Sequence, residues 1–205
     1  MARPSQADQP AGSRELVEGQ VRECYGRVVY SHKAHEKRAD ILLSRLSTIK
    51  LWQIILSSIT TAGFIAAIFG AGAIGAVIGV LVSTMLLVLN AYTKNYDLGE
   101  LAQKHRQAAA DLWLIREKYL ALITDLRVGK ESLEKITSRR DELLKDLHGV
   151  YSGAPSTTCQ AYKKAQEALQ QCEEMTFSDA EIDALLPREL KRAAAQAGGT
   201  GEGTE

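Results

Sequence analysis

The longest apolar stretch of the chain runs from Leu51 to Thr93 and contains no Lys, Arg, Asp, Glu or His. A helix of a soluble domain normally buries one face and keeps the other polar, so an uncharged run of this length does not fit one. A membrane-spanning helix needs about 20 mostly apolar residues, and this stretch is long enough for two. Glycines 70, 72 and 75 cluster near its middle. The pattern predicts a transmembrane hairpin, with helices at about residues 51–69 and 73–91 and a tight turn at 70–72.

The segments on either side of this stretch have the spacing of amphipathic helices. Apolar positions recur every three or four residues from Leu98 to Val128, and Gly129 follows as a helix stop. We expect this helix to pack through a seam that could also join protomers: Leu101, His105, Leu112, Ile115, Tyr119 and Leu122. A second seam follows in residues 133–150. Residues 14–50 also read as helix, continuous with the first membrane helix or broken near Gly26.

Shorter signals complete the order of elements. Residues 152–155 form a predicted turn, after which Ser156 or Thr157 can cap a helix that extends to about Cys172. Ser178 and Glu181 have the spacing of a capping box, and Pro187 ends the short helix that follows.

These elements predict an all-α membrane protein, a two-helix transmembrane hairpin with a cytoplasmic helical bundle. The expected boundaries are a disordered leader, a cytoplasmic helix leading into the membrane, the hairpin, the bundle and a disordered tail, at residues 1–13, 14–50, 51–93, 94–192 and 193–205. The leader lacks the apolar core of a signal peptide.

Basic residues indicate the orientation of the hairpin. They stand before its first helix and after its second, whereas the turn carries no charge: Lys33, Lys37, Arg38, Arg45, Lys50, Lys94, Lys104 and Arg106. Because Lys and Arg resist translocation, the chain is expected to be multi-pass with both termini cytoplasmic.

Overall charge argues against direct nucleic-acid binding. The 205 residues carry 25 basic and 25 acidic side chains, so the formal net charge is zero, and counterion release would contribute little to such binding. The three cysteines (Cys24, Cys159 and Cys172) lack metal-ligand spacing and are expected to be reduced thiols.

No catalytic motif is present in the sequence. There is no nucleophile elbow, P-loop, HExxH or paired-cysteine pattern, so we expect no enzyme, no catalytic residue, no cofactor and no metal site. His32 and His35 could share one helix face, but no further ligands stand nearby, so they are expected to be solvated. His105 falls within a seam and is expected to be packed or interfacial.

Polar and small residues recur on both membrane helices. The candidates for helix packing or for lining a pore are Gln53, Ser57, Thr61, Gly75, Gly79, Ser83 and Asn90. Small residues allow close backbone approach, and hydroxyl and amide groups can hydrogen-bond between helices. Two interpretations stay open: packing within a single hairpin, or contact within an assembly of several hairpins. Because two helices cannot enclose water, conduction would require oligomers.

Four basic residues of the expected bundle are candidates for an anion or signal contact: Arg139, Arg140, Lys163 and Lys164. Exposed helix faces commonly carry such charges, and that interpretation also stays open.

Several segments together resemble the SLATT family, the two-transmembrane effectors associated with bacterial SMODS and SLOG conflict systems. The resemblance covers about residues 30–190 and lies in the uncharged hairpin, HRQAAADLWLIREKYLALITDL at 105–126, ITSRRDELL at 136–144, GVYSGAPSTTCQAY at 149–162 and TFSDAEIDALLPREL at 176–190.

This resemblance implies a membrane effector of an anti-phage, nucleotide-signal-linked system, which oligomerises and perforates or depolarises the bacterial inner membrane on activation. The partners it implies are the lipid bilayer, further copies of the chain, and a nucleotide second messenger or a sensor protein. A non-conducting membrane anchor that recruits a cytoplasmic partner through its helical bundle is the alternative. A phage holin fits less well, because holins seldom carry so large a helical bundle.

Overall fold

The structure is a computed structural model that describes residues 11–70 and 72–187, and these residues form helices and connecting segments without a strand. The helices are α1 (Ala11–Ile68), α2 (Gly72–Asn95), α3 (Leu98–Val128), α4 (Leu133–Gly153), α5 (Cys159–Gln170) and α6 (Asp179–Leu185). The predicted all-α class with two long apolar helices is confirmed. Residues 1–10, Ala71 and 188–205, which include most of the predicted leader and the whole predicted tail, lie outside the described residues.

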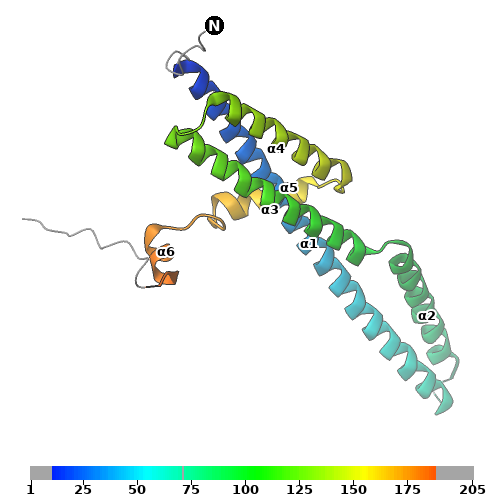
Figure 1. Cartoon of the computed structure of the whole chain (residues 1–205). Coiled ribbons are helices and arrows are strands. Elements are labelled where there is room, and N and C mark those ends of the chain that lie inside the picture. The colour runs from blue at the N-terminus through cyan, green and yellow to red at the C-terminus, as the bar shows by residue number, and fades with distance from the viewer. Residues whose placement is uncertain (1–10, 71, 188–205) are drawn as a thin grey trace, which may run out of the picture. The chain divides into compact units, whose positions relative to one another are not determined.

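The longest element is α1, a single helix of 58 residues. It passes through Gly26 without a break, so the interruption considered there is wrong, and it includes residues 11–13 of the predicted leader. Figure 1 shows α2 running beside its C-terminal half and α3 beside its N-terminal half. One continuous helix therefore contributes to both the hairpin and the apolar core that α1 forms with α3 and α4.

The hairpin turn lies at Phe69 and Gly70. Gly70 has a φ of 107°, a region that residues with a Cβ rarely adopt, so glycine suits this position. The two eighteen-residue windows that could span a membrane are each only 6% buried, which is unlike the core helix of a soluble protein.

The second hairpin helix is joined to α3 through Tyr96 and Asp97. The Asp97 carboxylate accepts a hydrogen bond of 2.8 Å from the backbone N–H of Glu100, which satisfies one of the free amides of the first turn. At the other end, Gly129 adopts a left-handed conformation with φ of 73°, and its N–H donates to the Asp125 carbonyl. These two signals explain why α3 begins and ends at the predicted residues.

Helix α3 packs antiparallel to the N-terminal half of α1. The Arg14 guanidinium donates to the Leu126 carbonyl at 2.8 Å, while Arg106 pairs with Asp40 at 2.9 Å. The main core lies between these helices and α4 and consists of Val21, Val28, Leu112, Ile115, Tyr119, Leu122, Leu126, Ile136 and Leu143. A smaller core nearer the hairpin contains Ala39, Leu42 and Ala102.

Helix α4 returns antiparallel to α3, since Lys118 pairs with Asp146 at 3.0 Å and Arg139 with Asp125 at 2.8 Å. After α4, the Thr158 hydroxyl accepts from the Ala161 N–H at 3.3 Å. The cap of α5 is therefore Thr158, and the prediction of Ser156 or Thr157 is wrong by one or two positions.

By contact density the chain divides into residues 1–166 and 167–205. Within the second unit, the expected capping box at the start of α6 is confirmed, with the Ser178 N–H donating to Glu181 at 2.8 Å and the Glu181 N–H donating back to the Ser178 hydroxyl at 3.3 Å.

Candidate functional site: the hairpin and the histidines behind it

The two hairpin helices meet along one face of each. The least exposed positions of α1 in this region recur every three or four residues, at Gln53, Leu56, Thr60, Gly63 and Ala67. Their counterparts on α2 are Gly75, Gly79, Val82, Leu86, Leu89 and Thr93. The interface is therefore a small-residue contact near the turn and becomes polar at the opposite end.

Small residues bring the two backbones close together near the turn. A Cβ placed on Gly63 would lie 3.9 Å from both the Gly75 carbonyl oxygen and the Gly79 Cα. Gly75, Gly79 and Ser83 are the small candidate residues of α2, and the structure places the first two inside one hairpin. The third, Ser83, is exposed on the outside.

Replacing Gly63 tests this contact. Gly63→Ala is expected to be tolerated, because 3.9 Å is ordinary van der Waals contact, whereas Gly63→Leu places further carbons against the α2 backbone. Overpacking of this kind costs about 1–3 kcal/mol, so the leucine variant should show a lower Tm in detergent and faster proteolysis at the turn. Equal melting temperatures for both variants would contradict the close approach.

The polar end of the hairpin is held by Gln53. Its side-chain amide donates to the Asn90 Oδ1 at 2.8 Å and lies 3.3 Å from the Thr93 hydroxyl. Gln53 and Asn90, two candidates for pore lining, therefore bond to each other across the hairpin, which matches the interpretation of packing within a single hairpin.

A groove of about 860 Å³ opens beside this interface, on the outer surface of α1. Its polar lining includes Ser57, Ser58 and Thr61, with Gln53 and Asn90 at one end. The hydroxyl of Ser58 donates to the Ile54 carbonyl at 2.9 Å and that of Thr61 to the Ser57 carbonyl at 3.0 Å, which is how such residues are tolerated in lipid.

The two serine hydroxyls at positions 57 and 83 lack such a bond. Ser57 and Ser83 are both exposed, and within the described residues neither side chain makes a hydrogen bond. An unsatisfied polar group in hydrocarbon is costly. These two serines are thus the positions where the hairpin has the most to gain from a neighbouring protein surface.

Histidines form a buried polar cluster between α1 and α3. His105 is completely buried, and its Nδ1 lies 3.0 Å from the Nδ1 of His35, so the two rings share one proton across this contact. Burial, together with the neighbouring His35 and Arg38, lowers the pKa of His105 to about 4. Burial likewise lowers the pKa of His35 and His32.

This cluster corrects one expectation. His32 and His35 are only 7% and 4% exposed, so the prediction of solvated faces is wrong. Both lie on the side of α1 that α3 covers, and the pattern of a single segment does not reveal which neighbour covers it. His105 is packed, as expected, and among the described residues no group of three potential metal ligands is found.

The other seam residues lie as follows. Leu112, Ile115, Tyr119 and Leu122 are buried in the core of one protomer, and Leu101 packs beside the smaller core. Burial raises the pKa of Tyr119 to about 12, with Cys24 adding to the shift. These side chains hold α1, α3 and α4 together.

The four basic candidates do not form one site with free charges. Arg139 pairs with Asp125 and Glu131 at 2.8 and 2.9 Å, and Arg140 pairs with Asp141 at 2.8 Å and bonds to Gln20. Lys163 and Lys164 are exposed on α5. None of the four lines the cleft described next.

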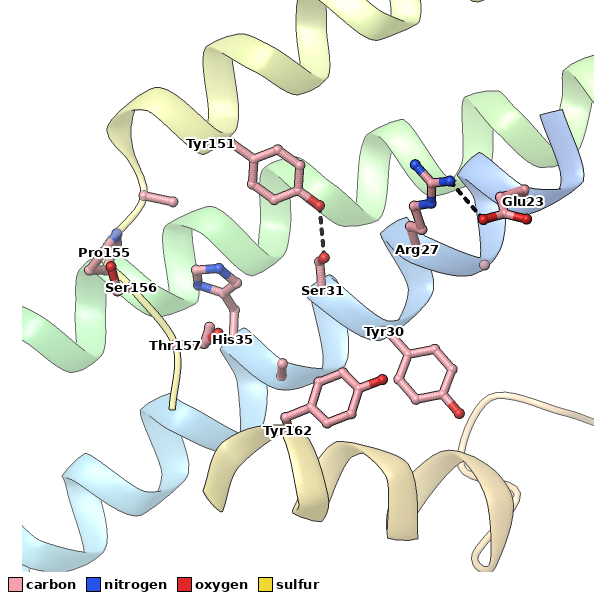
Figure 2. Close-up of a pocket in the computed structure, with 13 residues that line it drawn as sticks. Glu23, Arg27, Tyr30, Ser31, His35, Tyr151, Pro155, Ser156, Thr157 and Tyr162 are labelled. Atoms are coloured by element: carbon pink, nitrogen blue, oxygen red, sulfur yellow. Dashed lines mark hydrogen bonds and ion pairs between the residues drawn. The ribbon is translucent and has the colours of Figure 1, made fainter. Parts of the chain in front are cut away.

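Sequence reasoning missed a cleft bounded by α1, the end of α4 and the start of α5 (Figure 2). Tyr30, Tyr151 and Tyr162 lie around it, together with His35 and the loop from Ala154 to Thr157. The segment GVYSGAPSTTCQAY contributes Tyr151, the loop and Tyr162 to this cleft, but its local pattern predicts only a turn and a helix cap.

Comparison with known proteins identifies a family. No curated protein and no solved structure matches the chain. A family model described as "SMODS and SLOG-associating 2TM effector domain family 4" matches residues 17–181, which include the hairpin, the histidine cluster and the cleft. This match agrees with the resemblance drawn from the sequence and, with the two exposed apolar helices, indicates a membrane location. The chain belongs to this family of two-transmembrane effector domains, SLATT family 4.

Proposed function

We propose that this chain is a membrane effector of a bacterial anti-phage system, in which a nucleotide-linked signal makes several hairpins assemble and perforate or depolarise the inner membrane. The observation that carries the proposal is the outer polar surface of the hairpin. Ser57 and Ser83 point away from the hairpin interface without a hydrogen bond among the described residues. Lipid offers them no partner, whereas a second hairpin or a water-filled path does.

Assembly follows from the geometry of two helices. The inner faces of α1 and α2 are occupied by each other, so one hairpin encloses no aqueous path. The groove at Ser57 and Thr61 is open to the outside, and several copies turned about a common axis would bring these grooves together. Polar groups on an inward face are what ion or water passage requires.

The orientation that fits this proposal has both termini in the cytoplasm. Basic residues flank the hairpin, and its turn at Phe69 and Gly70 is uncharged. The core built by α1, α3 and α4 would then lie on the side where a cytoplasmic signal is made.

A cysteine-accessibility scan of α1 tests the proposal. After replacement of Cys24, Cys159 and Cys172, cysteines are placed at Ser57 and Thr61, with Ile55 and Ile59 on the opposite exposed face as matched controls. In cells that take up a membrane-impermeant dye after induction, we expect a water-soluble thiol reagent to label positions 57 and 61 and to spare 55 and 59. Helical periodicity in the labelling would identify an aqueous face.

The second candidate function is a non-conducting anchor that recruits a cytoplasmic partner. The Gln53–Asn90 hydrogen bond of 2.8 Å favours it, because it satisfies the most polar groups within one hairpin. Protection of all four positions, in cells that arrest growth without taking up dye, would reject perforation and leave this function in its place.

A further inference from the structure

The cleft beside α1 has the size of a small-molecule site. Its volume is about 940 Å³, within the ~300–1,000 Å³ usual for ligand pockets. Its walls come from α1, from Tyr151 of α4, from the loop containing Ser156 and Thr157, and from Tyr162 of α5. All of these residues belong to the first unit of the chain, residues 1–166.

Aromatic side chains dominate the cleft. Tyr30 and Tyr162 stack with ring centroids 5.7 Å apart and planes inclined by 23°. Tyr162 and Tyr151 remain 51% and 43% exposed, although apolar rings normally gain by burial. Three of the seven tyrosines of the chain thus border one cleft. Exposed aromatic faces of this kind suit a planar ring that stacks on them.

A buried histidine forms part of the cleft wall. His35 is 4% exposed and lines the cleft, and its Nδ1 is engaged with His105. Within the described residues its Nε2 makes no hydrogen bond. A ligand atom that accepts from Nε2 would make His105 the donor across the 3.0 Å contact. The cleft therefore offers one polar ring nitrogen of a largely buried histidine to the edge of a heterocycle.

Charge and hydroxyl groups complete the lining. Arg27 borders the cleft and pairs at 2.6 Å with Glu23 on the solvent-exposed surface of α1. An exposed pair of this kind contributes little to stability, so a phosphate can replace Glu23 as the partner of the guanidinium. Tyr151 donates to Ser31 at 2.7 Å, while Ser156 and Thr157 are exposed and carry hydroxyls that suit a sugar.

We propose that this cleft binds a nucleotide. The base stacks on Tyr162, its polar edge meets His35, the sugar contacts the loop hydroxyls and a phosphate pairs with Arg27. This inference rests on the proposed function in naming the cleft as the place where the signal is received. Because α1 runs without a break from His35 to Gln53, a ligand held there contacts the same helix that forms the hairpin.

Binding to the purified full chain in detergent tests the proposal. The probes are the mononucleotides, the cyclic mononucleotides and the cyclic dinucleotides of adenine, guanine, cytosine and uracil, with the free nucleosides and inorganic phosphate as separate arms. We expect at least one nucleotide to bind and to raise the Tm. Its nucleoside should bind at least tenfold more weakly, and phosphate alone should have no effect.

Matched variants locate the site. Tyr162→Ala and Arg27→Ala should each weaken binding at least tenfold, with the apo Tm unchanged. Tyr96→Ala, which removes another exposed tyrosine that lies outside the cleft, and Arg22→Ala, which removes another ion-paired arginine of α1, should leave binding unchanged.

The proposal is overturned if no nucleotide of the panel binds at millimolar concentration, or if Tyr162→Ala and Arg27→Ala bind as the unaltered chain does. Dye entry, measured in cells that express the same chain, separates a failure of nucleotide binding from a failure of membrane activity. If cells that express the chain take up dye but the purified chain binds no nucleotide, the nucleotide site is rejected and the proposed effector function stands. If the purified chain binds a nucleotide but cells that express it never take up dye, perforation is rejected and the nucleotide site stands.

Discussion

Leu112→Asp is expected to unfold the core that α1, α3 and α4 share. Leu112 is completely buried beside Val21, Val28 and Ile115. Removing a buried leucine costs about 2–5 kcal/mol on its own, and an unpaired carboxylate in the same place adds a desolvation penalty of several kcal/mol. The sum is comparable to the whole stability of a domain, about 5–15 kcal/mol. We therefore expect no cooperative melting transition and no membrane activity.

The control for this variant stands two residues away. Leu114 is 51% exposed on the same helix, so Leu114→Asp introduces the same charge without burying it. Far-ultraviolet circular dichroism and thermal melting in detergent should show a native-like profile for Leu114→Asp and loss of the transition for Leu112→Asp. A Leu112→Asp chain that melts like the unaltered protein would mean that this seam does not hold the fold.

The helices were predictable where a local signal fixes them. The expected bounds of α3, Leu98–Val128, agree with the structure because Asp97 caps one end and Gly129 adopts the left-handed conformation at the other. The hairpin was predictable because a segment as long as Leu51–Thr93 without a charged residue is typical of membrane-spanning helices and not of a soluble domain. In both cases the residues that determine the element lie within one continuous segment of the sequence.

Features that depend on which helices pack together were not predictable in this way. The spacing of His32 and His35 shows that they can share a face, but not that α3 covers it. Likewise, Gln53, Ser57 and Thr61 form a single polar stripe along the helix, yet α2 covers Gln53 and leaves Ser57 and Thr61 outside. The cleft needs residues from three separate segments, so no single pattern in the sequence describes it.

The histidine cluster makes the stability of the fold depend on pH. In the unfolded chain a histidine has a pKa of 6.5, whereas burial lowers the pKa of His105 to about 4 in the folded chain. Between these two values the unfolded state binds more protons, so stability is complete above the unfolded pKa and falls as the pH falls through the window. For His105 alone the loss by pH 4 is about 3 kcal/mol, and the lowered pKa values of His35 and His32 act in the same direction.

Thermal melting between pH 7.5 and pH 5 measures this effect. A loss of 1 kcal/mol lowers the Tm of a chain of this size by about 2–4 °C, so the Tm should fall clearly over this range.

Replacing both partners, with His35→Leu and His105→Leu together, removes the shared proton and two buried imidazoles without leaving an unpaired ring. The double variant should therefore melt with a much weaker pH dependence, while His148→Gln, which alters an exposed histidine of α4, should behave like the unaltered chain. A Tm that is flat in the unaltered chain, or equally steep in the double variant, would show that the buried pair does not remain neutral in the folded state.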